Sequence, residues 1–168
     1  MLKRTLSIIS RLTALFEEYL VAFLLILVTV LMFVQVVMRY VFAKRLLGYE
    51  ELARYSMIWL AFIGAAYATR LRSHIKVDIL PLIIKDERSL KKAEIIQDFL
   101  SFAFCTVFLY WLWVLLQAAG YRTPALGIPV WVPQMGIVIG FILMLCYFLA
   151  HFIKGVRDLI HAEPAKDE

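Results

Sequence analysis

The chain has 168 residues, of which 63% are apolar and 18% are charged. Water-soluble domains usually carry about 45–50% apolar and about 25% charged residues, so this composition excludes an ordinary soluble globule. The net charge of +5 is better explained by membrane topology than by nucleic-acid binding, which would need a basic face on a soluble domain.

The first predicted membrane span covers residues 19–40. Residues 19–38 contain no formal charge, and a helix of this length matches the thickness of the hydrocarbon layer. The preceding apolar residues recur at three- and four-residue spacing, which predicts an amphipathic N-terminal helix that lies on the membrane surface through Lys3, Arg4 and Arg11. The apolar run begins late and lacks a cleavage site, so we expect an anchor and not a signal peptide.

The second predicted span, residues 48–70, contains a shorter apolar stretch. Residues 55–69 are uncharged, so the helix reaches spanning length only if it includes Glu50, Glu51 and Arg54 at a membrane boundary. Their spacing permits i,i+4 and i,i+3 ion pairs near a helix N-terminus, where carboxylates are favoured. Two explanations fit equally: a local ion pair, or contact with another subunit.

The connection over residues 70–98 is predicted to be cytoplasmic and amphipathic. Arg70 and Arg72 close the second span and are expected at the membrane surface. A new helix with charged first turns is expected to lead directly into the third span, residues 97–121.

The fourth predicted span covers residues 131–154 and follows a segment that contains Pro124 and Pro129. The predicted fold class is therefore an all-α integral membrane protein with four transmembrane helices. No repeat or linker divides the chain, so residues 1–168 are expected to form a single membrane domain.

The distribution of Lys and Arg predicts the orientation of the chain. With four spans, thirteen of these residues fall on the side of the termini and the 70–98 connection, and five fall on the other side. The positive-inside rule then places both termini in the cytoplasm.

Small residues form two motifs typical of close helix packing in lipid. Packing inside the chain and docking onto another membrane subunit both remain open explanations for them. One motif is a stripe of Ala61, Gly64, Ala65 and Ala68, and the other is a G-x-x-x-G of Gly136 and Gly140.

Residues that would carry chemistry are sparse. Cys105 and Cys146 lie far apart, without a C-x-x-C pattern, and are expected to pack as small hydrophobes. We therefore expect no catalytic site, metal or cofactor. Polar residues within the predicted spans are compatible with helix-to-helix hydrogen bonds. This pattern favours an accessory or scaffold subunit over an enzyme or an autonomous transporter.

Five segments along the chain form a recognisable pattern. They are Met38-Arg39-Tyr40-Val41-Phe42, Glu50-Glu51-Leu52-Ala53-Arg54-Tyr55, Trp59-Leu60-Ala61-Phe62-Ile63-Gly64-Ala65-Ala66, His74-Ile75-Lys76-Val77-Asp78, and Pro124-Ala125-Leu126-Gly127-Ile128-Pro129 with Trp131. In these segments, and in its size and four-span layout, the chain resembles the small membrane subunit of tripartite ATP-independent periplasmic (TRAP) transporters. The resemblance covers nearly the whole chain.

The resemblance implies a location in the bacterial inner membrane and two partner proteins. One is a large multi-span subunit that carries the substrate and sodium sites, and the other is a periplasmic substrate-binding protein. The implied substrates are organic acids such as C4-dicarboxylates, sialic acids and other sugar acids. The small subunit would act as a scaffold for the large one. The alternative is a membrane scaffold or assembly subunit of another complex, without a role in transport.

This interpretation assigns candidate roles to exposed and small residues. Membrane lipids are expected to contact the basic residues placed at the membrane surface, which are Lys3, Arg4, Arg11, Arg70 and Arg72. Candidates for contact with the large subunit are Ala61, Gly64, Ala65, Ala68, Glu50, Glu51 and Arg54, and candidates for docking the binding protein are Arg39, Lys44, Arg45, Arg122 and Trp131.

Overall fold

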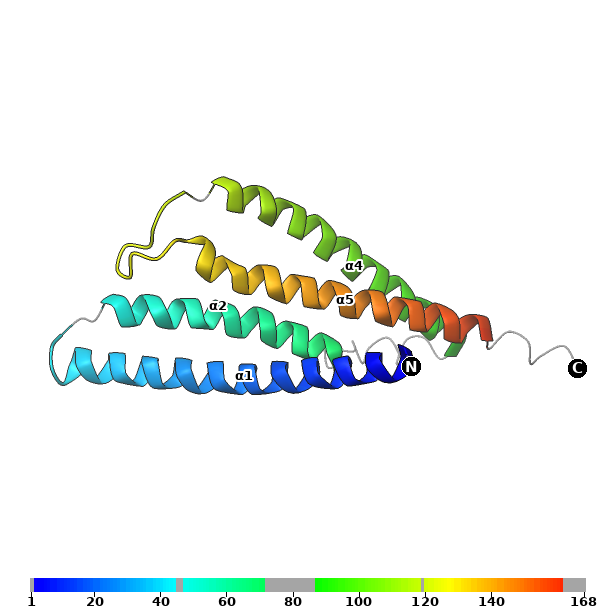
Figure 1. Ribbon diagram of the computed structural model, residues 1–168, viewed down its shortest axis with the longest axis horizontal. Coiled ribbons are helices and arrows are strands. Elements are labelled where there is room, and N and C mark those ends of the chain that lie inside the picture. The colour runs from blue at the N-terminus through cyan, green and yellow to red at the C-terminus, as the bar shows by residue number, and fades with distance from the viewer. Residues whose placement is uncertain (1, 45–46, 72–86, 119, 162–168) are drawn as a thin grey trace, which may run out of the picture.

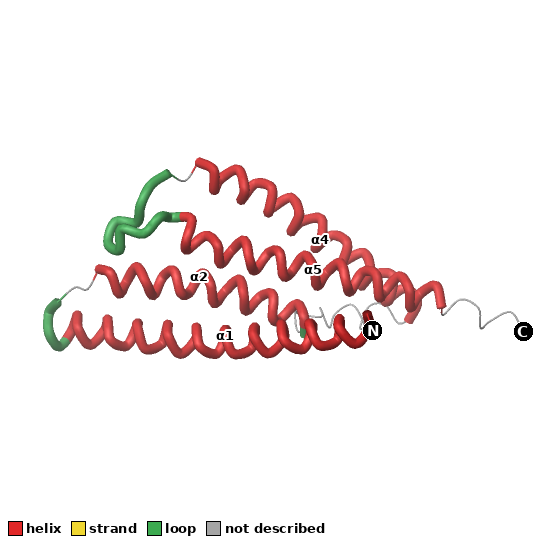
Figure 2. Tube along the Cα trace, in the orientation of Figure 1, coloured by secondary structure: helices red, strands yellow, loops and turns green. Residues whose placement is uncertain are grey.

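The computed structural model describes residues 2–44, 47–71, 87–118 and 120–161. These residues form helices and loops, with no strand beyond an isolated bridge between Arg122 and Pro129 (Figure 2). The all-helical fold class is therefore confirmed. The helices are α1 (Leu2–Tyr40), α2 (Leu47–Arg70), α4 (Glu87–Ala118) and α5 (Trp131–His161).

The helices lie side by side in the order α1, α2, α5, α4 (Figure 1). α2 packs against α1 and α5, and α5 packs against α2 and α4. Residues 41–44 and 120–130 lie at the same end of the bundle, which we call the loop end. The start of α1 and the last turns of α5 lie toward the opposite end, which we call the termini end.

Three of the helices are long and apolar enough to cross a membrane: α1, α4 and α5, over Thr13–Tyr40, Ser89–Gln117 and Trp131–Ile160. α2 falls short because charges lie near both of its ends, so that only residues 55–69 are free of charge between Arg54 and Arg70. Its position between α1 and α5 lets protein cover two of its sides in place of lipid. We therefore retain α2 as a proposed fourth span.

Three helices extend well beyond the spans that the sequence predicts: α1 and α4 begin earlier, and α5 continues to His161, past the predicted residue 154. α1 has 39 residues, so at 1.5 Å per residue it is about 58 Å long, well above the hydrocarbon thickness of about 30 Å. The predicted N-terminal amphipathic segment is helical, but it continues into the span without a break, and its location on the membrane surface stays a prediction. The charged first turns of α4 also run directly into the apolar part, and α4 ends at Ala118, before the predicted residue 121. Residues 72–86, which include Arg72, lie outside the described part.

The core lies between α2, α4 and α5. Ala66, Cys105, Phe141 and Met144 form its buried cluster. The ring of Phe141 stacks on Phe108 of α4, with 4.4 Å between the ring centroids. The cluster thus combines small, sulfur-containing and aromatic side chains, and this mixture of sizes fills the space between the three helices.

The G-x-x-x-G motif packs inside the chain, at the contact between α5 and α2. A Cβ atom placed on Gly136 would lie 2.6 Å from Cδ1 of Trp59, and one on Gly140 would lie 2.7 Å from the backbone oxygen of Phe62. Neither distance is tolerated by real atoms, so the two glycines permit the close approach of α2 to α5.

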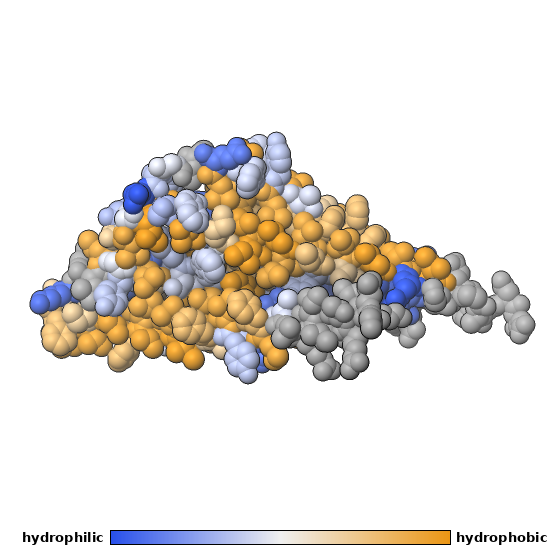
Figure 3. Space-filling model, in the orientation of Figure 1, coloured by the Kyte–Doolittle hydropathy of each residue, from blue (hydrophilic) through white to orange (hydrophobic). Residues whose placement is uncertain are grey.

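Much of the outer surface is apolar, as Figure 3 shows along the length of the helices. α1 and α4, at the edges of the arrangement, expose large aromatic side chains that a soluble protein would bury. This surface fits an environment of lipid or other membrane subunits. Examples are Phe16, Tyr19, Phe23 and Phe33 on α1, and Phe104, Tyr110, Trp111 and Trp113 on α4.

Candidate subunit-interface sites at the two ends of the bundle

Glu51 links α2 to the 120–130 loop at the loop end. Its side chain is buried, and its Oε2 atom accepts hydrogen bonds from the backbone N–H groups of Ala125, at 3.0 Å, and Leu126, at 2.7 Å. Its Oε1 atom accepts a hydrogen bond from the hydroxyl of Tyr55, at 2.8 Å. Both carboxylate oxygens are therefore engaged within the chain.

The 120–130 loop also carries hydrogen bonds of its own. The backbone N–H of Thr123 donates to the carbonyl of Ile128 at 2.8 Å, and the Thr123 hydroxyl accepts from the Ile128 N–H at 3.1 Å. Gly127 has a φ of +66°, in the left-handed region that glycine adopts without strain. The Arg122 guanidinium donates to the Gly127 carbonyl at 3.1 Å. The loop is thus a folded element that Glu51 fastens to the helices.

The other charges at the start of α2 face outward. Arg54 lies 3.9 Å from Glu50, and the exposed fractions of the two side chains are 69% and 50%. The i,i+4 pair expected from the sequence is present, but it is a loose surface contact. The adjacent acids therefore have different environments, because Glu51 points to the loop and Glu50 does not.

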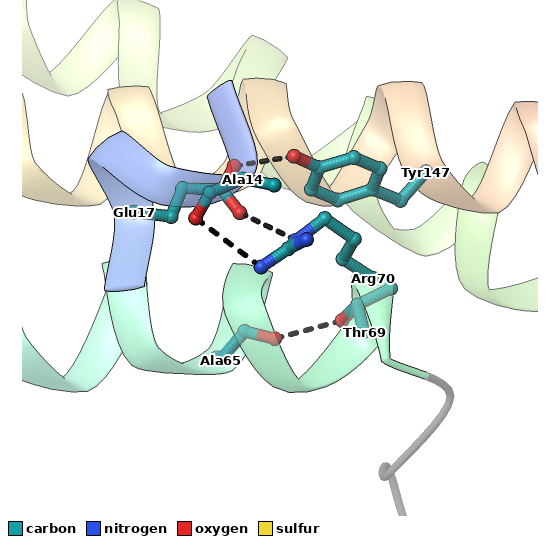
Figure 4. A network of polar contacts seen from close by, with 6 residues as sticks. All are labelled: Ala14, Glu17, Ala65, Thr69, Arg70 and Tyr147. Carbon is teal, nitrogen blue, oxygen red and sulfur yellow. Dashed lines mark hydrogen bonds and ion pairs between the residues drawn. The ribbon is translucent and has the colours of Figure 1, made fainter. Parts of the chain in front are cut away.

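A second buried glutamate lies toward the termini end (Figure 4). Glu17 of α1 forms an ion pair with Arg70 of α2, with 3.0 Å between Nε and Oε2. The hydroxyl of Tyr147, on α5, donates to the other oxygen of Glu17. Arg70 also donates to the carbonyl of Ala14 at 3.4 Å. Three helices that are distant in sequence are joined by this network.

Sequence reasoning missed this network. Arg70 was expected at the membrane surface, whereas its side chain is 22% exposed and paired with a carboxylate. The available signal was the position of Glu17, directly before a long apolar run, where an unpaired carboxylate is costly. No spacing rule identifies Tyr147 as the third member.

The small-residue stripe of α2 divides between two faces. Ala65 packs against the core cluster. Gly64, in contrast, faces open space, because a Cβ atom placed there meets nothing within 4 Å. Ala61 is exposed, and Ala68, one turn after Gly64, is partly buried. The structure thus leaves an open small-residue face on α2, which we define as Ala61 and Gly64.

The candidates for docking the binding protein gather toward the loop end. Arg39, Lys44 and Arg122 are exposed there, and Trp131 is half-exposed at the first position of α5. Arg45 lies outside the described residues. At the opposite end, Lys3, Arg4 and Arg11 belong to the first part of α1.

Two threonines within the spans bond inside their own helices. The hydroxyls of Thr29 and Thr106 donate to the carbonyls four residues earlier, at 2.8 and 2.9 Å. The hydroxyl of a helical threonine commonly reaches its own preceding turn in this way. Cys105 is buried in the core as expected, but Cys146 is exposed.

The described residues include no group of three or more His, Cys, Asp or Glu side chains placed to hold a metal ion.

Comparison with known proteins identifies the family. Residues 28–158 match the model of the family described as tripartite ATP-independent periplasmic transporters, DctQ component. The C4-dicarboxylate TRAP transporter small permease protein DctQ of Vibrio cholerae is 29% identical over 128 residues, which are 73% of this chain and 55% of that protein. A putative TRAP transporter small permease protein of Haemophilus influenzae is 41% identical over 63 residues, covering 38% of this chain and 39% of that protein.

The chain therefore spans about half or less of the length of these relatives. The family match alone covers well over half of the chain and agrees with the resemblance seen in the sequence. The chain belongs to the DctQ family of small TRAP transporter permease subunits.

Proposed function

We propose that this chain is the scaffold subunit of a sodium-coupled TRAP transporter that imports an organic acid across the bacterial inner membrane. The observation that carries the proposal is the use of its two buried glutamates. Glu17 and Glu51 each engage both carboxylate oxygens in contacts within the chain, and these contacts join helices or fasten a loop. They hold the subunit together, and substrate and sodium are handled by a large multi-span partner.

The substrate is an organic acid, of the C4-dicarboxylate, sialic acid or sugar acid type. The relative from Vibrio cholerae, which is named for C4-dicarboxylate transport, supports a carboxylate substrate. The family match also makes an assembly role in an unrelated complex the weaker explanation.

The open small-residue face of α2 is the surface that we assign to the large subunit. Helices associate in lipid mainly through close packing, because apolar burial gains little over contact with acyl chains. Gly136 and Gly140 already show this use inside the chain, where α5 meets α2. At Gly64 another helix could approach the backbone of α2 equally closely, because no atom of this chain fills the space beside it.

A matched pair of glycine substitutions tests this assignment. Gly64→Leu should insert and fold normally but lose co-purification with the large subunit, because the new side chain enters open space on the chain and blocks only an external surface. Gly140→Leu should instead destabilise the subunit itself, because Phe62 occupies the space. Membrane abundance and co-purification of each variant are measured together. If Gly64→Leu retains its partner, the open face is not the interface.

The loop end is proposed to face the periplasm and to dock the binding protein. Exposed basic residues there, with Trp131, offer charged and aromatic contacts of the kind common at protein interfaces. The 120–130 loop is held in a fixed shape by Glu51, so its docking surface exists before the partner arrives. Labelling of a cysteine placed at Gly127 by a reagent that cannot cross the membrane should succeed. If the same reagent also labels a cysteine placed at Lys91 from the periplasmic side, the proposed orientation is wrong.

A further inference from the structure

A cavity of about 190 Å³ lies toward the loop end, where α1, α2 and the first turn of α5 meet the 120–130 loop. Apolar cavities of about 150 Å³ stay dry and take apolar ligands. Two residues of the lining carry a hydroxyl, Tyr55 and Ser56, and that of Tyr55 donates to Glu51. The apolar part of the lining comes from Leu24, Leu52, Trp59, Ile128, Val132 and Pro133.

The hydroxyl of Ser56 is the polar group that the chain leaves unused in this cavity. Ser56 is only 7% exposed. The hydroxyls of Thr29, Thr69 and Thr106 each donate to the carbonyl four residues earlier, as helical hydroxyls commonly do. Within the described part of the chain, the Ser56 side chain makes no such bond and no other hydrogen bond. A buried hydroxyl without a partner is costly, so a ligand that accepts its hydrogen bond is favoured.

The hydroxyl and the apolar wall lie at different depths. Ser56 follows Glu51, which holds the loop, by five residues, or about 7.5 Å along α2. Leu24 precedes the end of α1 at Tyr40 by sixteen residues, or about 24 Å. The hydroxyl is therefore close to the loop, and the apolar wall continues deeper into the protein. An acyl chain of a phospholipid has the same order, with its ester carbonyl near the headgroup and methylene groups beyond it.

The position of the cavity around α2 favours lipid over the large subunit. Leu52 and Ala61 are nine residues apart, which is two and a half helical turns, so they lie on opposite sides of α2. On α1, the apolar neighbours of Leu24 are Phe23 and Leu25, and both are more than half exposed. In a membrane these side chains contact acyl chains. A lipid therefore reaches the cavity without crossing the surface assigned to the large subunit.

We propose that this cavity binds one acyl chain of a phospholipid from the membrane leaflet at the loop end. The Ser56 hydroxyl donates a hydrogen bond to the ester carbonyl at the start of that chain. Methylene groups fill the apolar part of the cavity beside Trp59. Because Ile128 of the 120–130 loop belongs to the wall, the bound chain also contacts this loop.

The fluorescence of Trp59 tests the proposal on the full-length chain. Replacing Trp111, Trp113 and Trp131 by Phe leaves Trp59 as the only tryptophan. Vesicles of phosphatidylcholine with brominated ester-linked chains should quench it. Unbrominated phosphatidylcholine with ester- or ether-linked chains of equal length then competes. The ether lipid lacks the carbonyl, so it should displace the brominated lipid about three to ten times less effectively. Absence of quenching, or equal displacement by both lipids, would overturn the proposal.

Variants of α2 in the same single-tryptophan chain locate the binding. Ser56→Ala should remain quenched but lose the preference for the ester lipid, because the donor is gone. Leu52→Phe fills part of the cavity and should reduce quenching. Met57→Phe is the control, because Met57 has a similar exposure on α2 but does not line the cavity. Circular dichroism checks that each variant is folded. An ester preference that survives Ser56→Ala, or equal quenching in the two Phe variants, would contradict the assignment.

Photo-crosslinking in the assembled transporter separates a lipid from a protein occupant. Benzoylphenylalanine in place of Leu52 should form no adduct with the co-expressed large subunit. Such an adduct would show that the partner covers the cavity and would overturn the lipid assignment. Benzoylphenylalanine in place of Ala61 tests the proposed subunit interface separately, because an adduct with the large subunit is expected there. The two proposals therefore fail on different results.

Discussion

Glu17 and Glu51 lie toward opposite ends of the bundle and have much in common, since both are buried and both accept a hydrogen bond from a tyrosine. They differ in their other partners. Glu17 pairs with the guanidinium of Arg70, whereas Glu51 accepts N–H groups from the loop backbone. At the termini end a specific side chain on another helix is needed, and at the loop end the backbone supplies the donors.

Because of this difference, substitutions in the two networks should reduce the stability of the protein to different extents. Removal of one member of a buried ion pair leaves an uncompensated charge, which is among the costliest defects in a protein. Removal of Glu51 leaves two backbone N–H groups without an acceptor, which is a smaller and more local defect. We therefore expect global destabilisation at the termini end and loosening of a loop at the loop end.

The largest effect is expected for Arg70→Met. The substitution leaves the Glu17 carboxylate buried without its cation, at a cost of about 3–5 kcal/mol. Resistance of the purified chain to thermal unfolding, followed by circular dichroism, should fall accordingly. The control is Arg157→Met, because Arg157 lies 3.9 Å from Asp158 in an exposed pair.

A second substitution sharpens this prediction. Adding Glu17→Gln to Arg70→Met removes the orphaned charge, so part of the lost stability should return. If the double variant is less stable than Arg70→Met alone, the ion pair is not the source of the effect.

A smaller, local effect is expected for Glu51→Ala. Loss of the acceptor for Ala125 and Leu126 costs about 1–3 kcal/mol and frees the 120–130 loop. Hydrogen exchange measured on a peptide that covers this loop should become faster while the core of α5 stays protected. Glu50→Ala is the matched control at the adjacent, exposed position. Similar exchange in both variants would show that Glu51 does not hold the loop.

The smallest effect is expected for Arg54→Ala. Its ion pair with Glu50 is loose and largely exposed to solvent, so its contribution lies below about 1 kcal/mol. Thermal unfolding of the isolated chain should therefore change little, and high salt should remove any difference. A marked loss of stability would mean that Arg54 has a buried partner.

The helices of this protein could be predicted well from its sequence. Long uncharged runs indicate where the apolar helices lie, and α-helices cover all four predicted spans except for the last residues of the third. The bounding charges do not mark the helix ends, because α1, α4 and α5 continue through charged turns beyond these spans. The family could also be recognised from short sequence motifs such as Glu50-Glu51-Leu52-Ala53-Arg54-Tyr55. The family match over residues 28–158 confirms this recognition.

The contacts that individual polar residues make could not be predicted in the same way. Glu50 and Glu51 are adjacent and chemically identical, and which of them faces the loop depends on how α2 is rotated against α5. Likewise, Gly64 and Gly140 belong to similar motifs, yet one faces open space and the other contacts Phe62. Sequence spacing shows that a helix face is small or charged, but packing determines what that face meets.

The most direct test of the scaffold account is uptake of a labelled organic acid by proteoliposomes under a sodium gradient, with the binding protein present. The vesicles contain this chain alone, the large subunit alone, or both. The account predicts no uptake by this chain alone and sodium-driven uptake when both are present. Sodium-driven uptake by this chain alone would contradict it.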